Sequence, residues 1–152
     1  MTRILMVCLG NICRSPLAHG IMQAQLPEDL FYVDSSGTAA YHIGKSPDKR
    51  SIAVARKHHI DISGQRARQF QVSDFDTFDI IYAMDDANYR DILKLARNTA
   101  DQNKVKLFLE ANSSIQNKNV PDPYYGDETD FEYVYNLIND TSKILHKELI
   151  YL

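Results

Sequence analysis

The chain has 152 residues, a length typical of one domain with a proper core, so we expect residues 1–152 to form a single domain. Hydrophobic residues make up 44% and charged residues 24%, as in ordinary globular proteins, and the net charge of −3 argues against a nucleic-acid partner. The longest apolar run, residues 4–9, is too short to cross a membrane or to form a signal peptide.

Apolar runs and amphipathic segments alternate along the chain. The patterns predict strands at residues 3–8, 31–35, 78–84 and 105–109, and helices at residues 16–26, 47–58, 86–97 and 129–149. Thr129 and Glu132 are suitably spaced for a capping box on the last helix. Strands and helices that alternate in this way predict a doubly wound α/β fold, in which helices cover both faces of a four-stranded parallel sheet.

The first predicted strand leads directly into a loop and then a helix. Ser15 and Pro16 predict the helix start, with a hydroxyl to cap it and a proline at its first position. Such a loop aims backbone N–H groups and the positive helix end at an anion, and Gly10 and Asn11 tolerate the left-handed backbone of a tight cradle. We therefore predict a phosphate-binding loop after strand 1, made of Leu9, Gly10, Asn11, Ile12, Cys13, Arg14 and Ser15.

Two residues of this loop carry the predicted chemistry. Cys8, at the base of the cradle, is the candidate nucleophile, because helix dipole, amides and a cation together stabilise a thiolate. Arg14 offers a planar fork that matches two phosphate oxygens, and Ser15 is close enough in sequence to donate its hydroxyl to the Cys8 sulfur. A lone cysteine at a strand end is more often a core residue, but the neighbouring residues favour the catalytic role.

A second motif lies in the polar segment 112–125, where Asp122 stands between two prolines. Asp122 is the candidate general acid for the leaving group, and later the base for the attacking water. An isolated Asp-Pro pair is more often a solvated turn, and the catalytic interpretation depends on its coincidence with the cysteine loop. Tyr41, Tyr124 and Tyr125 are candidates for aromatic walls around a flat substrate ring, although each tyrosine alone is more often packing or surface.

These motifs resemble those of the low-molecular-weight protein tyrosine phosphatases. Residues 8–16 match the family's cysteine loop, residues 120–126 match its acid motif, and residues 33–38 and 83–85 match interior segments. The resemblance implies a protein tyrosine phosphatase that hydrolyses phosphotyrosine in proteins through a cysteinyl-phosphate intermediate. It implies no cofactor and no metal.

The resemblance also implies supporting roles. Ser35 would hydrogen-bond the Asn11 side chain and keep the loop in shape, and Asp85 would help to position the site, unless it only caps the following helix. The family's second loop cysteine, here Cys13, can close a reversible disulfide, but packing beneath the loop is an equal alternative. The tyrosine pair at residues 124 and 125 leaves open a weak homodimer. Two cysteines and no signal peptide predict a cytoplasmic location.

Three other functions compete with this one. An arsenate reductase would need additional cysteines beyond Cys13 to relay a disulfide. A phosphoarginine phosphatase tends to carry threonine where Ile12 stands, so phosphotyrosine is the better prediction. A phosphopeptide-binding module without activity would be expected to have lost Cys8, Arg14 or Asp122. Neither the acidic residues at positions 74, 76 and 79 nor the histidine pair at 58 and 59 has the spacing of a metal site, and no metal is predicted.

Overall fold

The computed structural model describes residues 1–151 and contains one parallel sheet of four strands. The strands lie in the order β2-β1-β3-β4, and every neighbouring pair is parallel. The predicted α/β class is therefore confirmed. Their bounds are β1 (Thr2–Cys8), β2 (Phe31–Gly37), β3 (Ile80–Ala83) and β4 (Val105–Leu107).

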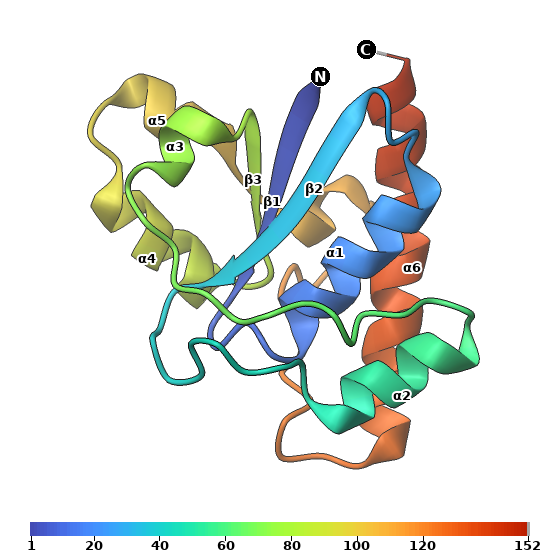
Figure 1. The fold of residues 1–152 in the computed structure, drawn as a ribbon. Helices are drawn as coiled ribbons and strands as arrows, with labels where there is room; N and C mark the ends of the chain where they lie inside the picture. The colour runs from blue at the N-terminus through green and yellow to red at the C-terminus, as the bar shows by residue number, and fades with distance from the viewer. Residues whose placement is uncertain (152) are drawn as a thin grey trace.

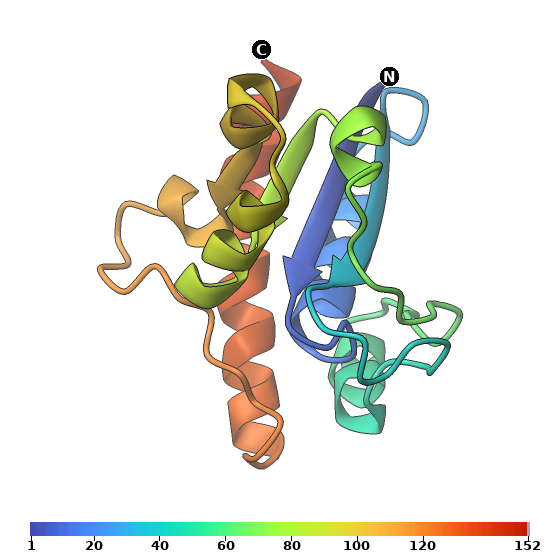
Figure 2. The ribbon, with the colours of Figure 1, turned by 90° about the vertical axis from the view of Figure 1, so that its left-hand side faces the viewer.

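Helices cover both faces of this sheet, as predicted (Figure 1). One face carries α1 (Arg14–Gln25), α2 (Lys49–Lys57) and α6 (Glu128–Ile150). The other carries α3 (Asp74–Thr77), α4 (Asp86–Leu95) and α5 (Thr99–Lys104), which stand in front of the sheet in Figure 2. The short α3, α5 and 3-10 helix η1 (Phe108–Ala111) were not predicted, because four to six residues are too few to show a period.

The alternation of side chains along β1 divides the core into two parts. Ile4 and Met6 pack in the cluster under α1 and α6, whereas Leu5 and Val7 pack in the cluster under α3 and α4. All four side chains are fully buried. The continuous apolar run at the start of the chain therefore reflects a strand that is covered on both faces.

The strand order places the crevice of the sheet at the end of β1. The neighbours of β1 are β2 on one side and β3 on the other, so the chain adds its second strand on one side of β1 and its later strands on the other. In open α/β sheets, ligands bind outside the carboxyl ends of the strands at such a switch point. The loop that follows Cys8 occupies this position, at the lower end of the sheet in Figure 1.

Two predicted helix caps are wrong. The α1 helix begins at Arg14 with Cys13 in the cap position, and the Ser15 hydroxyl points to the cysteine sulfur instead. In α6 the capping box is formed by Asp127 and Asp130, not by Thr129 and Glu132. Glu132 is unavailable because its carboxylate contacts Lys57 and His58 at the end of α2.

The other polar residues considered for metal binding have protein partners. The carboxylates of Asp74 and Asp76 pair with Arg68 and Arg97 respectively, and Asp79 accepts the backbone N–H of Arg3. The His58 ring stacks on Tyr135 with centroids 4.0 Å apart. Within residues 1–151, no three potential metal ligands lie together.

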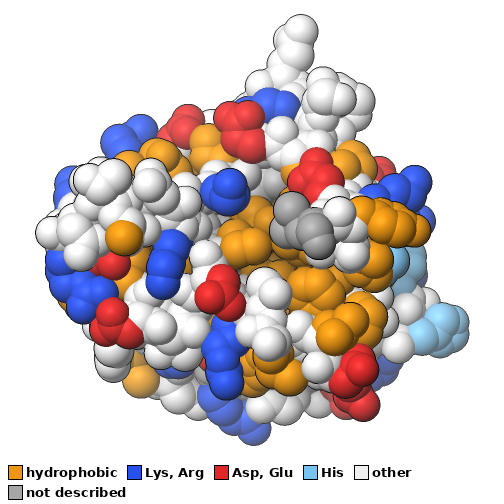
Figure 3. Space-filling model, turned by 90° about the horizontal axis from the view of Figure 1, so that it is seen from above, with side chains coloured by type: hydrophobic (Ala, Val, Ile, Leu, Met, Phe, Trp, Pro, Cys, Tyr) orange, Lys and Arg blue, Asp and Glu red, His pale blue; other side chains and the backbone are white. Residues whose placement is uncertain are grey.

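The two ends of the sheet differ in character. The end with both termini, seen from above in Figure 3, gathers apolar side chains beside the C-terminus. A shallow hollow there is lined by Met1, Thr2, Pro27, Leu30, Phe31, Leu149 and Ile150.

None of the helices in the described residues is long and apolar enough to span a membrane.

Candidate active site

Cys8 ends β1 at the base of the crevice and is 2% exposed. Its sulfur lies 3.0 Å from the Ser15 hydroxyl oxygen in the first turn of α1. Because α1 starts directly behind the loop, its positive end points at the same place. The predicted partnership of Ser15 with the cysteine is confirmed by this contact.

Asn11 gives the loop its tight shape. Its backbone is left-handed, with a φ of 57°, a conformation that asparagine tolerates better than most residues. Its side-chain amide donates to the Ser15 hydroxyl at 2.8 Å and accepts the Arg68 backbone N–H at 3.1 Å. Gly10 is not left-handed, contrary to the prediction, and a Cβ added there would lie 2.9 Å from the His42 ring, which would have to shift.

The predicted hydrogen bond between Ser35 and Asn11 is wrong. The Ser35 hydroxyl lies 3.1 Å from Nδ1 of His19, one turn further along α1 than Ser15. Burial lowers the pKa of His19, although nearby Asp34 and Gln65 partly oppose this. Ser35 therefore ties β2 to α1, and the Asn11 side chain is held by other partners.

Arg14 is an almost completely buried cation held by carboxylates. Its guanidinium donates to Asp85 at 2.6 Å and to the Val120 carbonyl at 3.0 Å, and it lies 3.8 Å from the Asp122 carboxylate. Burial alone would lower the pKa of Arg14, but the charges of Cys8, Asp85 and Asp122 raise it above its ordinary value. Asp85 serves both of its proposed structural roles, because its second oxygen accepts the Asn88 N–H and caps α4.

One hollow of about 300 Å³ brings the predicted residues together. Asp122 stands at its rim with a side chain that is 44% exposed, and the rings of Tyr124 and Tyr125 meet edge to face. Asn11 and Ser15 support the loop from behind. The lining consists of Cys8, Leu9, Gly10, Ile12, Cys13, Arg14, Tyr41, His42, Asp122, Tyr124 and Tyr125.

A buried cysteine, an arginine fork and a carboxylate around one hollow are the parts of a cysteine-dependent phosphatase. A family model described as low molecular weight phosphotyrosine protein phosphatase matches residues 3–150. The chain belongs to this family. Its function is that of a protein tyrosine phosphatase, a hydrolase, as predicted.

Known members of the low molecular weight phosphatase family are similar along almost the whole chain. The low molecular weight phosphotyrosine protein phosphatase of Gallus gallus is 42% identical over 137 residues, which cover 87% of this chain and 85% of that protein. The one from Schizosaccharomyces pombe is 39% identical over 152 residues, covering 97% and 96%. The crystal structure of a protein tyrosine phosphatase from Entamoeba histolytica superimposes with a TM-score of 0.91 at 33% identity, covering 98% and 97%.

Two residues of this phosphatase site were missed by the sequence analysis. His42 lines the hollow next to Tyr41. The only feature of the sequence that could have indicated this is that His42 directly follows Tyr41 in the chain. Arg50 hydrogen-bonds the loop that carries Asp122. Its signal was Asp48 two residues earlier, a short acidic-basic pair that many surface helices contain.

Cys13 differs from Cys8 in its surroundings. It is 4% exposed, and both cysteines are free thiols. Burial, followed by the negative charges of Asp48, Cys8 and Asp122, raises the pKa of Cys13 to about 12. Cys13 is therefore a neutral thiol at pH 7, and the choice between packing beneath the loop and a reversible disulfide with Cys8 stays open.

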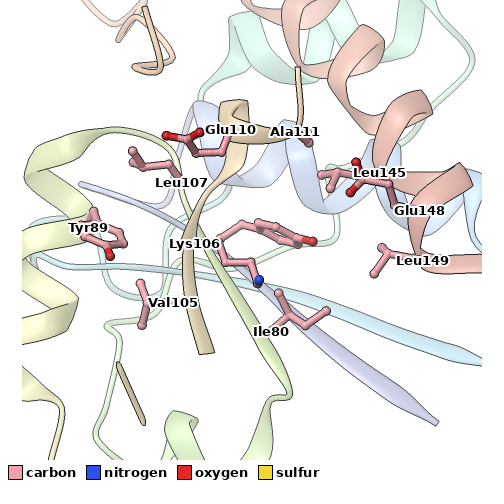
Figure 4. A pocket seen from close by; sticks show the side chains of 11 residues that line it. Ile80, Tyr89, Val105, Lys106, Leu107, Glu110, Ala111, Leu145, Glu148 and Leu149 are labelled. Carbon is pink, nitrogen blue, oxygen red and sulfur yellow. The ribbon is translucent and has the colours of Figure 1, made fainter. Parts of the chain in front are cut away.

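A larger hollow of about 570 Å³ lies beside the edge strand β4 (Figure 4). Aliphatic side chains and two tyrosines, Tyr82 and Tyr89, line it together with Lys106, Glu110 and Glu148. It contains neither a cysteine nor an arginine, so it lacks both the nucleophile and the fork of the phosphatase site.

Proposed function

We propose that Cys8, Arg14 and Asp122 together hydrolyse phosphotyrosine in protein substrates in two steps. The Cys8 thiolate attacks phosphorus in line, so an S–P bond forms while the bond to the tyrosine oxygen breaks. Asp122 gives its proton to the departing oxygen. In the second step Asp122 takes a proton from water, the resulting hydroxide attacks phosphorus, and phosphate and the free thiolate are released.

Electrostatic stabilisation supplies most of the rate effect in this scheme. Arg14 and the amides of residues 9–15 face the equatorial oxygens, where negative charge accumulates. The observation that supports the scheme best is the 3.8 Å separation of the Arg14 guanidinium and the Asp122 carboxylate above one hollow with Cys8 at its base.

A flat aryl group is the substrate that this hollow favours. Tyr41 and Tyr124 line it, and Ile12 adds an aliphatic wall where a polar side chain would suit a guanidinium better. Phosphotyrosine is therefore preferred to phosphoarginine. The arsenate reductase alternative has no support, because the sequence contains only two cysteines, Cys8 at the start of the loop and Cys13 within it.

Phosphate release from a phosphotyrosine peptide and from phosphoarginine, measured side by side, tests the proposal. We expect turnover of phosphotyrosine that Cys8→Ser abolishes without loss of phosphate binding. Preference for phosphoarginine would keep the mechanism and overturn the substrate. Binding without turnover would instead identify a phosphate-binding module.

We further infer a single domain over residues 1–152 and a cytoplasmic location, and the choice between a monomer and a weak homodimer stays open. Two free thiols suit a reducing compartment, and Tyr125, which is 95% exposed, offers an apolar contact beside the site. Sedimentation at increasing protein concentration tests the dimer, and a monomer at every concentration would contradict it.

A further inference from the structure

Arg50, in the first turn of α2, bonds to the loop that carries Asp122. Its guanidinium donates to the Tyr124 carbonyl at 2.9 Å and to the Gly126 carbonyl at 3.1 Å. The backbone N–H of Tyr124 donates to the Asp122 carboxylate at 3.1 Å. The backbone of Tyr124 is therefore held at both polar groups, because Arg50 binds its carbonyl and the Asp122 carboxylate binds its N–H.

The other side of Arg50 is anchored to the cysteine loop. Both carboxylate oxygens of Asp48 accept from the guanidinium at 3.0 Å, and the Asp48 N–H donates to the Ile12 carbonyl at 2.8 Å. The Asp48 hydrogen bonds raise the pKa of Arg50, which therefore stays charged. A continuous chain of hydrogen bonds thus joins the nucleophile loop to the acid loop through one guanidinium.

Aromatic rings hold the guanidinium in place. Its central carbon lies 4.5 Å from the Phe131 ring centroid and 5.7 Å from the Tyr124 ring centroid. Cation–π contacts of this kind limit the rotation of a side chain that is partly open to solvent. Phe131 is 1% exposed, so one of the two rings is a fixed part of the core.

No other side chain replaces this connection. Among the described residues 1–151, Arg50 is the only side chain outside the segment that hydrogen-bonds the backbone of residues 121–126. The preceding residue, Val120, is fixed to Met84 and Arg14, but apart from the two Arg50 bonds the backbone of residues 121–126 has only internal hydrogen bonds among the described residues. Arg14 contacts the Asp122 carboxylate at 3.8 Å, but the backbone that carries Asp122 is tied to the rest of the protein by Arg50.

We propose that Arg50 is a positioning residue that holds Asp122 in place for proton transfer to the leaving group. The proposal rests on the proposed role of Asp122 as general acid. A displacement of about 1 Å in a catalytic group can cost about 100-fold in rate. The loss should depend on the substrate, because a leaving group that is stable as an anion does not need the proton.

The experiment compares kcat/KM for a phosphotyrosine peptide and for p-nitrophenyl phosphate, whose leaving group needs no acid. We expect Arg50→Ala to lower the first by at least about 10-fold and the second by less than about 3-fold, because general acid catalysis contributes about 10²- to 10⁴-fold in all. The ratio of the two values does not depend on the fraction of active protein, so partial misfolding cannot imitate the effect.

Two further variants of arginines on α2 complete the test. Arg50→Lys keeps the charge but not the fork and should show a smaller loss of the same kind, which also covers the case that Arg50→Ala does not fold. Arg56→Ala is the matched control, because Arg56 is exposed on α2 and has no side-chain hydrogen bond among the described residues. It should change neither substrate's kcat/KM.

A double-mutant comparison separates this proposal from the proposed function. In an Asp122→Asn background, Arg50→Ala should cost nothing further, since the group that it positions is gone. The role of Arg50 is overturned if Asp122→Asn shows the leaving-group dependence but Arg50→Ala leaves kcat/KM unchanged or lowers it equally for both substrates. If Asp122→Asn itself affects both substrates equally, the acid assignment fails.

Discussion

Asp85 connects Arg14 to the framework of the fold through its two carboxylate oxygens. One accepts from Arg14 at 2.6 Å and the other accepts from the first turn of α4 at 2.8 Å. The same side chain therefore orients a buried guanidinium and caps a helix. These two roles predict different consequences for two substitutions.

Asp85→Asn should lower kcat/KM for phosphotyrosine by about 10- to 150-fold, because a charge-assisted hydrogen bond contributes about 1.5–3 kcal/mol. Its melting temperature should fall only through the weakened pair with Arg14, since asparagine caps helices as well as aspartate does. Asp85→Ala should lose the cap too, at about 1 kcal/mol or about 2–4 °C. Steady-state kinetics and thermal unfolding of both variants test this, and full activity of Asp85→Asn would contradict it.

At the scale of elements, the end of β2 supports the cysteine loop through close backbone contact. A Cβ added at Gly37 would lie 2.6 Å from the Leu9 carbonyl oxygen and 3.1 Å from the Asn11 nitrogen. Both are backbone atoms of the loop that is proposed to bind phosphate, so they cannot move aside without deforming it. Periodicity predicted the strand, but it carried no information on this contact.

Gly37→Ala should therefore lower kcat/KM by at least about 10-fold, because the loop amides would leave their positions around the phosphate. Overpacking also costs about 1–3 kcal/mol of stability. Gly64→Ala is the matched control, because an added Cβ there meets nothing within 4 Å. Kinetics and unfolding are measured on both variants, and equal behaviour of the two would contradict the predicted contact.

At the scale of the whole molecule, the site is assembled from segments that are distant in the sequence. The nucleophile loop follows β1, Asp85 precedes α4, and Asp122 lies in the segment before α6. Only the folded chain brings these segments together. A phosphate ion that binds there should therefore stabilise the folded state.

Phosphate at about 100 times its dissociation constant should add about 2.7 kcal/mol of stability, which corresponds to about 5–11 °C in melting temperature. Thermal unfolding in phosphate and in chloride of equal ionic strength measures this shift. Arg14→Lys should lose most of it, because lysine lacks the planar fork. The same melting temperature in both salts would show that the loop does not bind phosphate.

The sequence by itself determined the fold class and the chemistry of the cysteine loop. Cys8, Arg14 and Ser15 lie within one strand-loop-helix unit, so the contact between Cys8 and Ser15 follows from local geometry. The partners of Arg14 lie in distant segments. The hydrophobic periods likewise determined the long helices and the strands, because these elements bury whole faces. The tertiary structure alone decided which partners Asn11 and Ser35 have, and that Arg50 reaches the acid loop. Those contacts join segments far apart in the chain, and their geometry depends on how the helices pack on the sheet.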